Sequence, residues 1–382
     1  MQSQRTAFSI PSDTTYLNCA YMGPLPKKVE AAGIEAMKRK RNPGAITAMD
    51  FFSEADVLRK EYAKLINVKD PKRIVVIPSV SYAVANAVKN VALTKGDEVI
   101  VAAEEFPSDY YPWAVKCGET GATIRIITPP DILQRRGEKW NEKILDAIST
   151  KTKVVAISNV HWADGTLFNL IEIRRRTRDV GAALIIDGTQ SVGAMPFDVE
   201  QVQPDALICV GYKWLLGPYS IGLAYYGPMF DSGKPIEESW MNRMNSEDFR
   251  SLVQYNSQYK EGSLRYEVGE HSNFVYVPML IESLKLINQW KPANIQKYCA
   301  SITSAPIKKL REAGFWIEDT DSRGEHLFGI RLPAHVDIEK VAARFKKNKL
   351  FVSLRGNAIR VAVNVYNTKA DVEKLAGLLL SK

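Results

Sequence analysis

The chain has 382 residues, of which 46% are hydrophobic and 25% charged, a mixture typical of folded proteins. This composition argues against a disordered chain, and the length suits two domains better than one. The net charge of +8 does not predict a nucleic-acid partner, because the basic residues are mostly dispersed among acidic ones. No apolar run is long enough to span a bilayer, so no membrane association is expected either.

The cysteines and histidines, four of each, are scattered along the chain. Neither set has the spacing of a metal site, and no CxxC pair is present, so no metal is predicted. The first thirteen residues lack the apolar core of a signal peptide. Free thiols without a targeting segment indicate a cytoplasmic protein.

Short β-branched runs alternate with amphipathic stretches through the first part of the chain. Strands are predicted at residues 74–77, 98–102, 123–128, 153–158, 182–186, 206–210 and 221–226. Helices are predicted between some of them, at residues 82–93 and 170–180. Apolar strands separated by helices are typical of a largely parallel sheet that is buried on both faces. The fold class expected for this part is therefore α/β.

The pattern changes after about Ser263, where longer helical stretches begin. Helices are predicted at residues 279–290, 294–313, 338–348 and 369–380, with strands at 327–332, 350–354 and 358–363. This order of elements suits a smaller α+β domain. We expect a large domain at residues 15–262 and a small domain made of residues 263–382 together with 1–14.

Two strands of the predicted sheet end in residues that are unusual at such positions, and ligands bind at the carboxyl ends of strands in open α/β sheets. Asp187 follows four apolar residues, where it is either a helix N-cap or a fixed negative charge for a cationic partner. Lys213 follows the strand at 206–210, beside Tyr212 and Trp214. These aromatic neighbours would lower the pKa of the lysine, as a Schiff-base amine requires, although most lysines are simply solvated.

A third unusual place is the segment Pro78-Ser-Val-Ser81, between a predicted strand and a predicted helix. Small hydroxyl residues at a helix N-terminus form an anion site, although an ordinary serine N-cap explains them equally well. The segment lacks the glycines of an ATP or NAD fingerprint. Together with Asp187 and Lys213, it matches a ligand with a phosphate, a basic ring nitrogen and an aldehyde. That ligand is pyridoxal 5'-phosphate (PLP).

The run Asp187-Gly-Thr-Gln190-Ser-Val-Gly, followed by Gly-Tyr-Lys213-Trp-Leu-Leu-Gly-Pro, resembles aminotransferase class V. This family contains cysteine desulfurases, selenocysteine lyases, kynureninases and isopenicillin-N-epimerase-like proteins. The segments at 16–26, 265–269 and 359–368 resemble further parts of it, so the resemblance covers nearly the whole chain. It implies a fold-type I PLP-dependent transferase, with a mostly parallel, seven-stranded type of sheet in a large domain and a small α+β C-terminal domain.

The resemblance also implies roles for individual residues. Lys213 would bind PLP as a Schiff base and later carry the proton at the substrate Cα, while Asp187 would pair with the ring nitrogen. Arg360 would bind the α-carboxylate of an amino-acid substrate in the bidentate manner of a guanidinium, with Asn18 at the same substrate site. The remaining cofactor contacts are expected from Val80 and Ser81 at the phosphate, Phe106 stacked on the ring, Gln190 at the phenolic oxygen, Asp109 and Tyr212.

The resemblance leaves the reaction open between a transaminase and a lyase. Residues 106–110 with Tyr212 resemble kynureninase, whereas Gln190 is similar to the desulfurases, and Trp162 stands where many members have an asparagine. Desulfurases need a mobile cysteine shortly before the carboxyl-terminal arginine, and residues 349–360 contain none, which disfavours persulfide chemistry. Kynureninase-like, epimerase-like, and selenocysteine lyase or cysteine desulfurase-like activities are the alternatives.

A protein that binds PLP without turning anything over is the alternative from another class. The presence of Lys213, Asp187 and Arg360 argues against it. The family forms its active site at a dimer interface, so the resemblance implies a homodimer that acts on a small-molecule substrate, an α-amino acid or a related amine.

Overall fold

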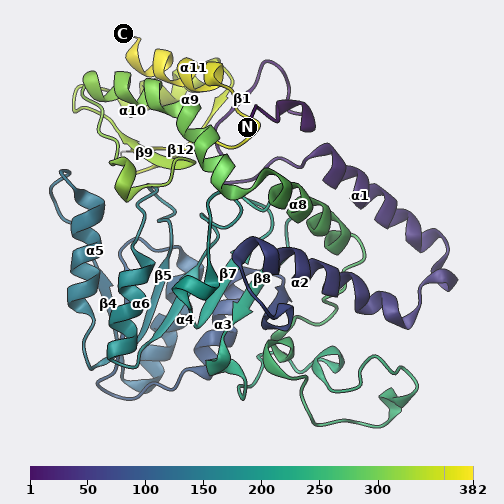
Figure 1. The fold of residues 1–382 in the computed structure, drawn as a ribbon. Coiled ribbons are helices and arrows are strands. Elements are labelled where there is room, and N and C mark those ends of the chain that lie inside the picture. Colours follow the sequence, from purple (N-terminus) through teal and green to yellow (C-terminus); the bar gives the residue numbers. More distant parts are fainter. Residues whose placement is uncertain (357, 382) are drawn as a thin grey trace.

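The computed structural model describes residues 1–356 and 358–381, and its centre is a seven-stranded sheet in the order β2-β8-β7-β6-β5-β3-β4 (Figure 1). β8 runs antiparallel to both of its neighbours, and the other strands pair in parallel. The predicted α/β fold with a mostly parallel sheet is therefore confirmed. The strands are β2 (Ile74–Ile77), β3 (Glu98–Ala102), β4 (Thr123–Ile127), β5 (Thr152–Ser158), β6 (Ala183–Asp187), β7 (Ala206–Val210) and β8 (Gly222–Tyr226).

Helices cover both faces of this sheet, which is why its central strands are apolar throughout. Val75 and Ile77 of β2 pack into the core formed with α3 and α4, while Ile74 and Val76 pack on the opposite side with α2 and α8. This alternation follows from the two-residue period of a strand. The covering helices are α2 (Ser53–Ile66), α3 (Val80–Asn90), α4 (Pro107–Thr120), α5 (Arg136–Ala147), α6 (Leu170–Asp179), α7 (Val199–Val202) and α8 (Tyr276–Trp290).

The C-terminal part contains a three-stranded antiparallel sheet in the order β11-β12-β9, with helices packed around it (Figure 1). This sheet and its helices confirm the α+β character predicted for this part. Its elements are α9 (Pro292–Glu312), β9 (Leu327–Arg331), α10 (Ile338–Lys347), β10 (Leu350–Phe351), β11 (Ser353–Arg355), β12 (Ala358–Ala362) and α11 (Lys369–Leu380).

The single strand predicted at residues 350–354 is in fact two short strands, because its two halves have different partners. β10 pairs in parallel with β1 (Thr15–Tyr16), and β11 pairs with β12. The amino terminus thus lies against the C-terminal part, where the backbone N–H of Gln4 also donates to the carbonyl oxygen of Val365 at 2.7 Å. The domain boundary between residues 262 and 263 stays a prediction.

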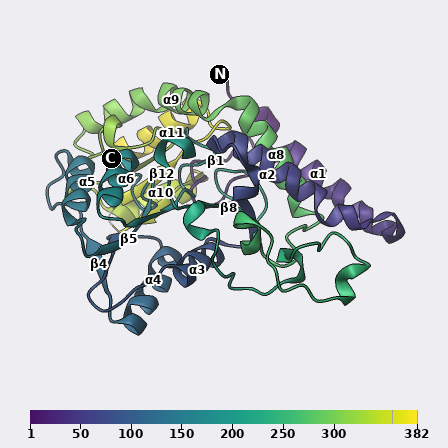
Figure 2. The same ribbon diagram turned by 60° about the horizontal axis from the view of Figure 1, so that its bottom comes forward.

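Helix α8 lies where the C-terminal part meets the rest of the chain. It packs against α1 (Lys27–Lys38) and α2, and Figure 2 shows α1 and α8 side by side. Among the residues that the structure describes, no helix combines the length and the apolar composition needed to cross a bilayer.

Candidate active site

The carboxyl ends of β6 and β7 and the amino end of α3 open onto one cavity of about 290 Å³. Parallel strands end at the same edge of a sheet, so residues far apart in the sequence meet there. The predicted site residues that line this cavity are Val80, Ser81, Phe106, Asp187, Tyr212 and Lys213. The structure therefore brings the three motifs of the sequence to one place.

Lys213 lies in the turn that follows β7 and is 8% exposed. Its Nζ is 5.3 Å from the centre of the Phe106 ring and 5.6 Å from that of Tyr212. Burial lowers the pKa of its amine to about 8, although the nearby negative charge of Asp187 offsets part of this shift and Arg360 adds to it. A substantial fraction of the amine is thus neutral, and therefore nucleophilic, near neutral pH.

The segment around Gly23 packs against the turn that carries Lys213 and holds it in place. The backbone N–H of Gly23 donates to the carbonyl oxygen of Tyr212 at 2.8 Å. A Cβ atom at position 23 would lie only 2.2 Å from the carbonyl oxygen of Lys213. Only glycine lets the two backbones approach this closely, so the opening segment supports the lysine turn directly.

Asp187, the last residue of β6, lies beside a second buried acid, Asp109, in the first turn of α4. The Oδ1 of Asp187 accepts a hydrogen bond from the backbone N–H of Thr189 at 2.8 Å. The Oδ2 of Asp109 is buried without a hydrogen-bond partner among the described residues. Burial raises the pKa of Asp109 well above its usual range, and the negative charges of Asp187 and Glu105 raise it further. These surroundings therefore favour the neutral, protonated form of Asp109 next to Asp187.

The amino end of α3 forms another wall of the cavity. Ser79 is the N-cap, and its Oγ accepts a hydrogen bond from the backbone N–H of Tyr82 at 3.2 Å. It also lies 2.9 Å from the Oγ of Ser81. Val80 and Ser81 begin the helix, and first-turn amides have no carbonyl partner within their own helix. Such an end suits an anion, and a phosphate in particular.

Arg360 projects from β12 and is 1% exposed. Its Nη1 donates to the carbonyl oxygen of Trp162 at 2.8 Å, and its Nη2 donates to the Oγ of Ser353 at 3.2 Å. The Oγ of Ser353 in turn donates to the Oδ1 of Asn18 at 2.8 Å, so both predicted substrate residues join one hydrogen-bonded group.

The guanidinium of Arg360 has no charged partner of its own. Its Nε is buried without a hydrogen-bond partner, and no carboxylate within residues 1–356 and 358–381 pairs with it. Burial lowers its pKa to about 9, and the neighbouring charge of Arg355 contributes. A buried cation without a carboxylate is costly, and an anionic ligand would remove that cost.

Gln190 does not line the cavity in this structure. Its Oε1 accepts a hydrogen bond from the indole N–H of Trp214 at 2.8 Å, and its Nε2 donates to the carbonyl oxygen of Ala20 at 3.3 Å. The predicted contact with the phenolic oxygen of PLP stays a prediction.

The cavity is also lined by residues that were not predicted, among them Ser79, Thr189 and Tyr219. Ser79 and Thr189 lie inside motifs that the sequence already singles out, as a cap and as a neighbour of Asp187. Tyr219 follows Lys213 by six residues, and its ring centre lies 4.6 Å from that of Tyr212. No sequence signal marks it, because its position depends on how the turn folds back.

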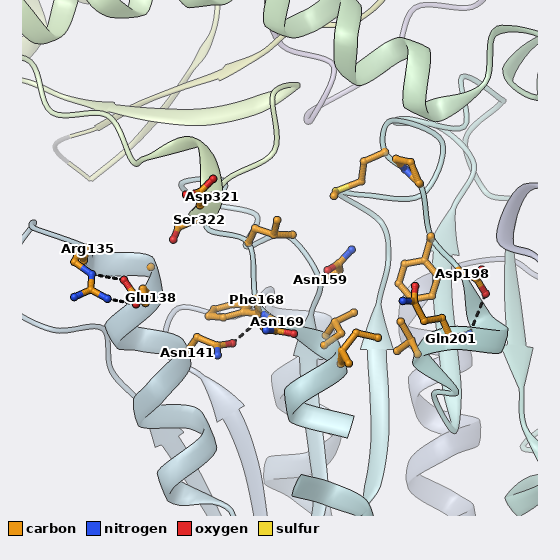
Figure 3. A pocket seen from close by; sticks show the side chains of 18 residues that line it. Arg135, Glu138, Asn141, Asn159, Phe168, Asn169, Asp198, Gln201, Asp321 and Ser322 are labelled. Atoms are coloured by element: carbon orange, nitrogen blue, oxygen red, sulfur yellow. Dashed lines mark hydrogen bonds and ion pairs between the residues drawn. The ribbon is translucent and has the colours of Figure 1, made fainter. Parts of the chain in front are cut away.

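A larger hollow of about 720 Å³ lies between α5, α6 and the segment before and in α7 (Figure 3). Some of its polar side chains are bonded to neighbouring residues of the same lining. Arg135 is paired with Glu138, and the Oδ1 of Asn141 accepts from the backbone N–H of Asn169 at 2.9 Å. Neither Lys213 nor Asp187 lines it. The predicted lysine and aspartate therefore line the smaller cavity and not the larger hollow.

The chain is similar to known proteins over most of its length. The family model for aminotransferase class V matches residues 45–375. The chain is 30% identical to a probable cysteine desulfurase of Methanothermobacter thermautotrophicus, over 96% of this chain and 94% of that protein. It is 24% identical to an uncharacterised aminotransferase of Bacillus subtilis, YcbU, over 84% of this chain and 81% of that protein.

Solved structures share the fold. C-DES, in a mutant with glycine covalently linked to its PLP cofactor, superposes with a TM-score of 0.87 at 18% identity and covers 98% of both chains. A cysteine desulfurase from Thermococcus onnurineus gives a TM-score of 0.84 at 20% identity, over 99% of this chain and 98% of that one.

The chain belongs to the aminotransferase class V family. It is accordingly a PLP-dependent enzyme with the fold-type I architecture, and the predicted family, fold, cofactor and enzyme class are confirmed.

Proposed function

We propose that this enzyme acts on an α-amino acid, with Lys213 bonding the aldehyde of PLP and Arg360 binding the substrate carboxylate. The observation that carries the proposal is the position of Lys213, a buried amine in one cavity with Asp187 and the amino end of α3. These three features match the aldehyde, the ring nitrogen and the phosphate of the cofactor.

The residues at the site fit the cofactor in charge and in shape. The buried Asp187 lies beside Asp109, whose surroundings favour the neutral acid, so Asp187 is the carboxylate that would pair with a protonated ring nitrogen. Phe106 lies over Lys213 and offers a flat apolar face to an aromatic ring. Val80 and Ser81 supply the helix amides for the phosphate, and Tyr212 closes the wall beside Tyr219.

When bound, PLP withdraws electrons from the bonds to the substrate Cα, and the protein residues direct that chemistry. Arg360 and Asn18 would hold the carboxylate end and so orient Cα. The amine of Lys213 would move a proton at Cα, and its lowered pKa suits a base near neutral pH. The rings of Phe106 and Trp162, which meet edge-on, would limit the access of water from their side.

A cysteine desulfurase-like activity is the second candidate, because the relative at 30% identity is named a probable cysteine desulfurase. The cysteines of this chain do not favour it. All four are buried and free, and burial raises the pKa of Cys19 to about 12. A mobile, reactive thiolate is absent from such surroundings. We therefore favour a transaminase or lyase reaction that uses no thiol of the enzyme.

A homodimer and a cytoplasmic location are part of the same proposal. The dimer is implied by the family, and exposed apolar side chains on the segment at 240–255 support it, among them Val253 at 83% exposure and the fully exposed Tyr255. The four free cysteines support a reducing compartment.

The proposal is tested by an absorbance screen of the purified PLP-loaded protein against the common amino acids and their decarboxylated amines. We expect at least one α-amino acid to change the cofactor spectrum at a concentration where its decarboxylated amine has little effect. Equal responses to both members of every pair, or no response to any compound, would overturn the proposed substrate class.

A further inference from the structure

Arg355 and Arg360 project from the same face of the β11–β12 hairpin. In the register of this pair, Ser353 lies opposite Arg360 and Arg355 lies opposite Ala358. Residues two apart on a strand share a face, so Arg355 is the diagonal neighbour of Arg360. Diagonal neighbours are separated by about 7–8 Å, which is within reach of long side chains.

The two guanidinium groups share one aromatic ring. The guanidinium carbon of Arg355 is 5.1 Å from the centre of the Trp162 ring, and that of Arg360 is 5.9 Å from it. The Trp162 ring meets Phe106 edge-on, with 5.6 Å between the ring centres. The centre of the Phe106 ring in turn lies 5.3 Å from the Nζ of Lys213. Arg355 is thus connected to the lysine through two successive aromatic rings.

Neither arginine has an acidic partner within the described ranges. Arg355 donates from Nη1 to the carbonyl oxygen of its own neighbour Leu354 at 2.7 Å, and its Nε is buried without a partner. Burial lowers the pKa of Arg355, and its charge helps to lower that of Arg360. Two neighbouring cations in a partly buried position repel each other, and no acidic residue among those that the structure describes pairs with either of them to offset this.

We propose that the substrate is an α-amino acid whose side chain itself ends in a carboxylate. Arg360 binds the α-carboxylate, and Arg355, on the same face of the hairpin, binds the side-chain carboxylate. This inference rests on the proposed function, since it takes Arg360 as the site of the α-carboxylate. It adds the chemical class of the side chain and the residue that selects it.

The test compares acids with their nearly isosteric amides on the PLP-loaded enzyme. The change in the cofactor spectrum is titrated with L-aspartate and L-glutamate, and with L-asparagine and L-glutamine. We expect at least one acid to bind ten or more times more tightly than its amide. In Arg355→Gln this preference falls to less than threefold while the affinity for the amide is retained, and Arg355→Lys keeps part of the preference.

Arg175→Gln is the matched control, because Arg175 is an exposed arginine that pairs with Glu172 on α6. It should keep the full preference of the unaltered enzyme. Equal affinity for acid and amide in the unaltered enzyme, or an equal loss for both in Arg355→Gln, overturns the inference. If neutral amino acids bind but acids have no advantage, the inference alone fails. If no amino acid changes the spectrum, the proposed function fails with it.

Discussion

The Nη1 of Arg360 donates a hydrogen bond to the carbonyl oxygen of Trp162 at 2.8 Å, so a residue of the C-terminal sheet is fixed against the loop that follows β5. The Nη2 is fixed by Ser353, which leaves Nε without a partner among the described residues. The guanidinium is thereby held in place before any ligand arrives, and such preorganisation favours the binding of a carboxylate.

Replacing Arg360 with lysine should weaken amino-acid binding although the charge is kept. Lysine offers a point charge and cannot form a planar bidentate contact. The loss of one charge-assisted hydrogen bond, about 1.5–3 kcal/mol, corresponds to a ten- to hundredfold weaker affinity. Titration with an amino acid and with its decarboxylated amine measures this, and the amine should be affected far less.

Arg174→Lys is the control for that experiment, because Arg174, on α6, is also largely buried but pairs with Asp205 and does not line the cavity. It should leave both affinities unchanged. Equal effects of Arg360→Lys on the amino acid and on the amine would mean that Arg360 stabilises the fold and does not recognise the carboxylate.

Asp187 and Asp109 should respond differently to the same chemical change. The raised pKa of Asp109 favours its protonated form, which asparagine resembles closely, so Asp109→Asn should lower turnover less than about tenfold. Asp187→Asn removes the charge opposite the ring nitrogen and should cost about 10²–10³-fold or more. Turnover per bound cofactor separates catalysis from binding. Losses of similar size in the two variants would contradict the separate roles.

Gly23→Ala should disturb the lysine turn, since the new Cβ would lie 2.2 Å from the carbonyl oxygen of Lys213. A backbone shift is the only relief, and overpacking of this kind costs about 1–3 kcal/mol of the free energy of unfolding. Turnover should fall as well, because Lys213 moves with the turn. Gly118→Ala is the control, since it lies in α4 with nothing within 4 Å of the new atom and should be neutral or slightly stabilising. A fully active Gly23→Ala variant would contradict the claim that the segment around Gly23 supports the turn of Lys213.

The pKa of about 8 for Lys213 predicts how cofactor uptake by the cofactor-free protein depends on pH. Only the neutral amine attacks the aldehyde, so the rate of uptake should rise with pH and level off above a midpoint near pH 8. Below this midpoint the amine is protonated and unreactive. Stopped-flow absorbance at several pH values gives the midpoint. A midpoint near that of an ordinary lysine, about 10.4, would mean that burial does not lower the pKa of Lys213.

The sequence predicts the parts of the site that depend on local pattern. Asp187 ends one apolar strand and Lys213 comes shortly after another, so their place at the strand ends could be predicted from the sequence alone. The same holds for the serines at the start of α3, although the helix begins at Val80 and not at residue 82, because Ser79 caps it.

The parts that depend on contacts between distant segments could not be predicted. The hydrogen-bonded group around Arg360 contains Asn18, Trp162 and Ser353. These residues are far apart in the sequence, and only the folded structure brings them together. The placement of Arg355 beside Arg360 likewise requires the pairing of β11 with β12. Helix α4 was not predicted either, since Pro112 and Gly118 interrupt its pattern, and burial of Trp113 and Cys117 compensates for them.

The central claim, that Lys213 bonds the cofactor, is tested most directly by borohydride reduction of the PLP-loaded protein followed by peptide mass mapping. We expect a single reduced cofactor adduct on Lys213, and none on any lysine of Lys213→Ala treated in the same way. An adduct on another lysine in the unaltered protein, or no adduct after loading with PLP, would contradict the account.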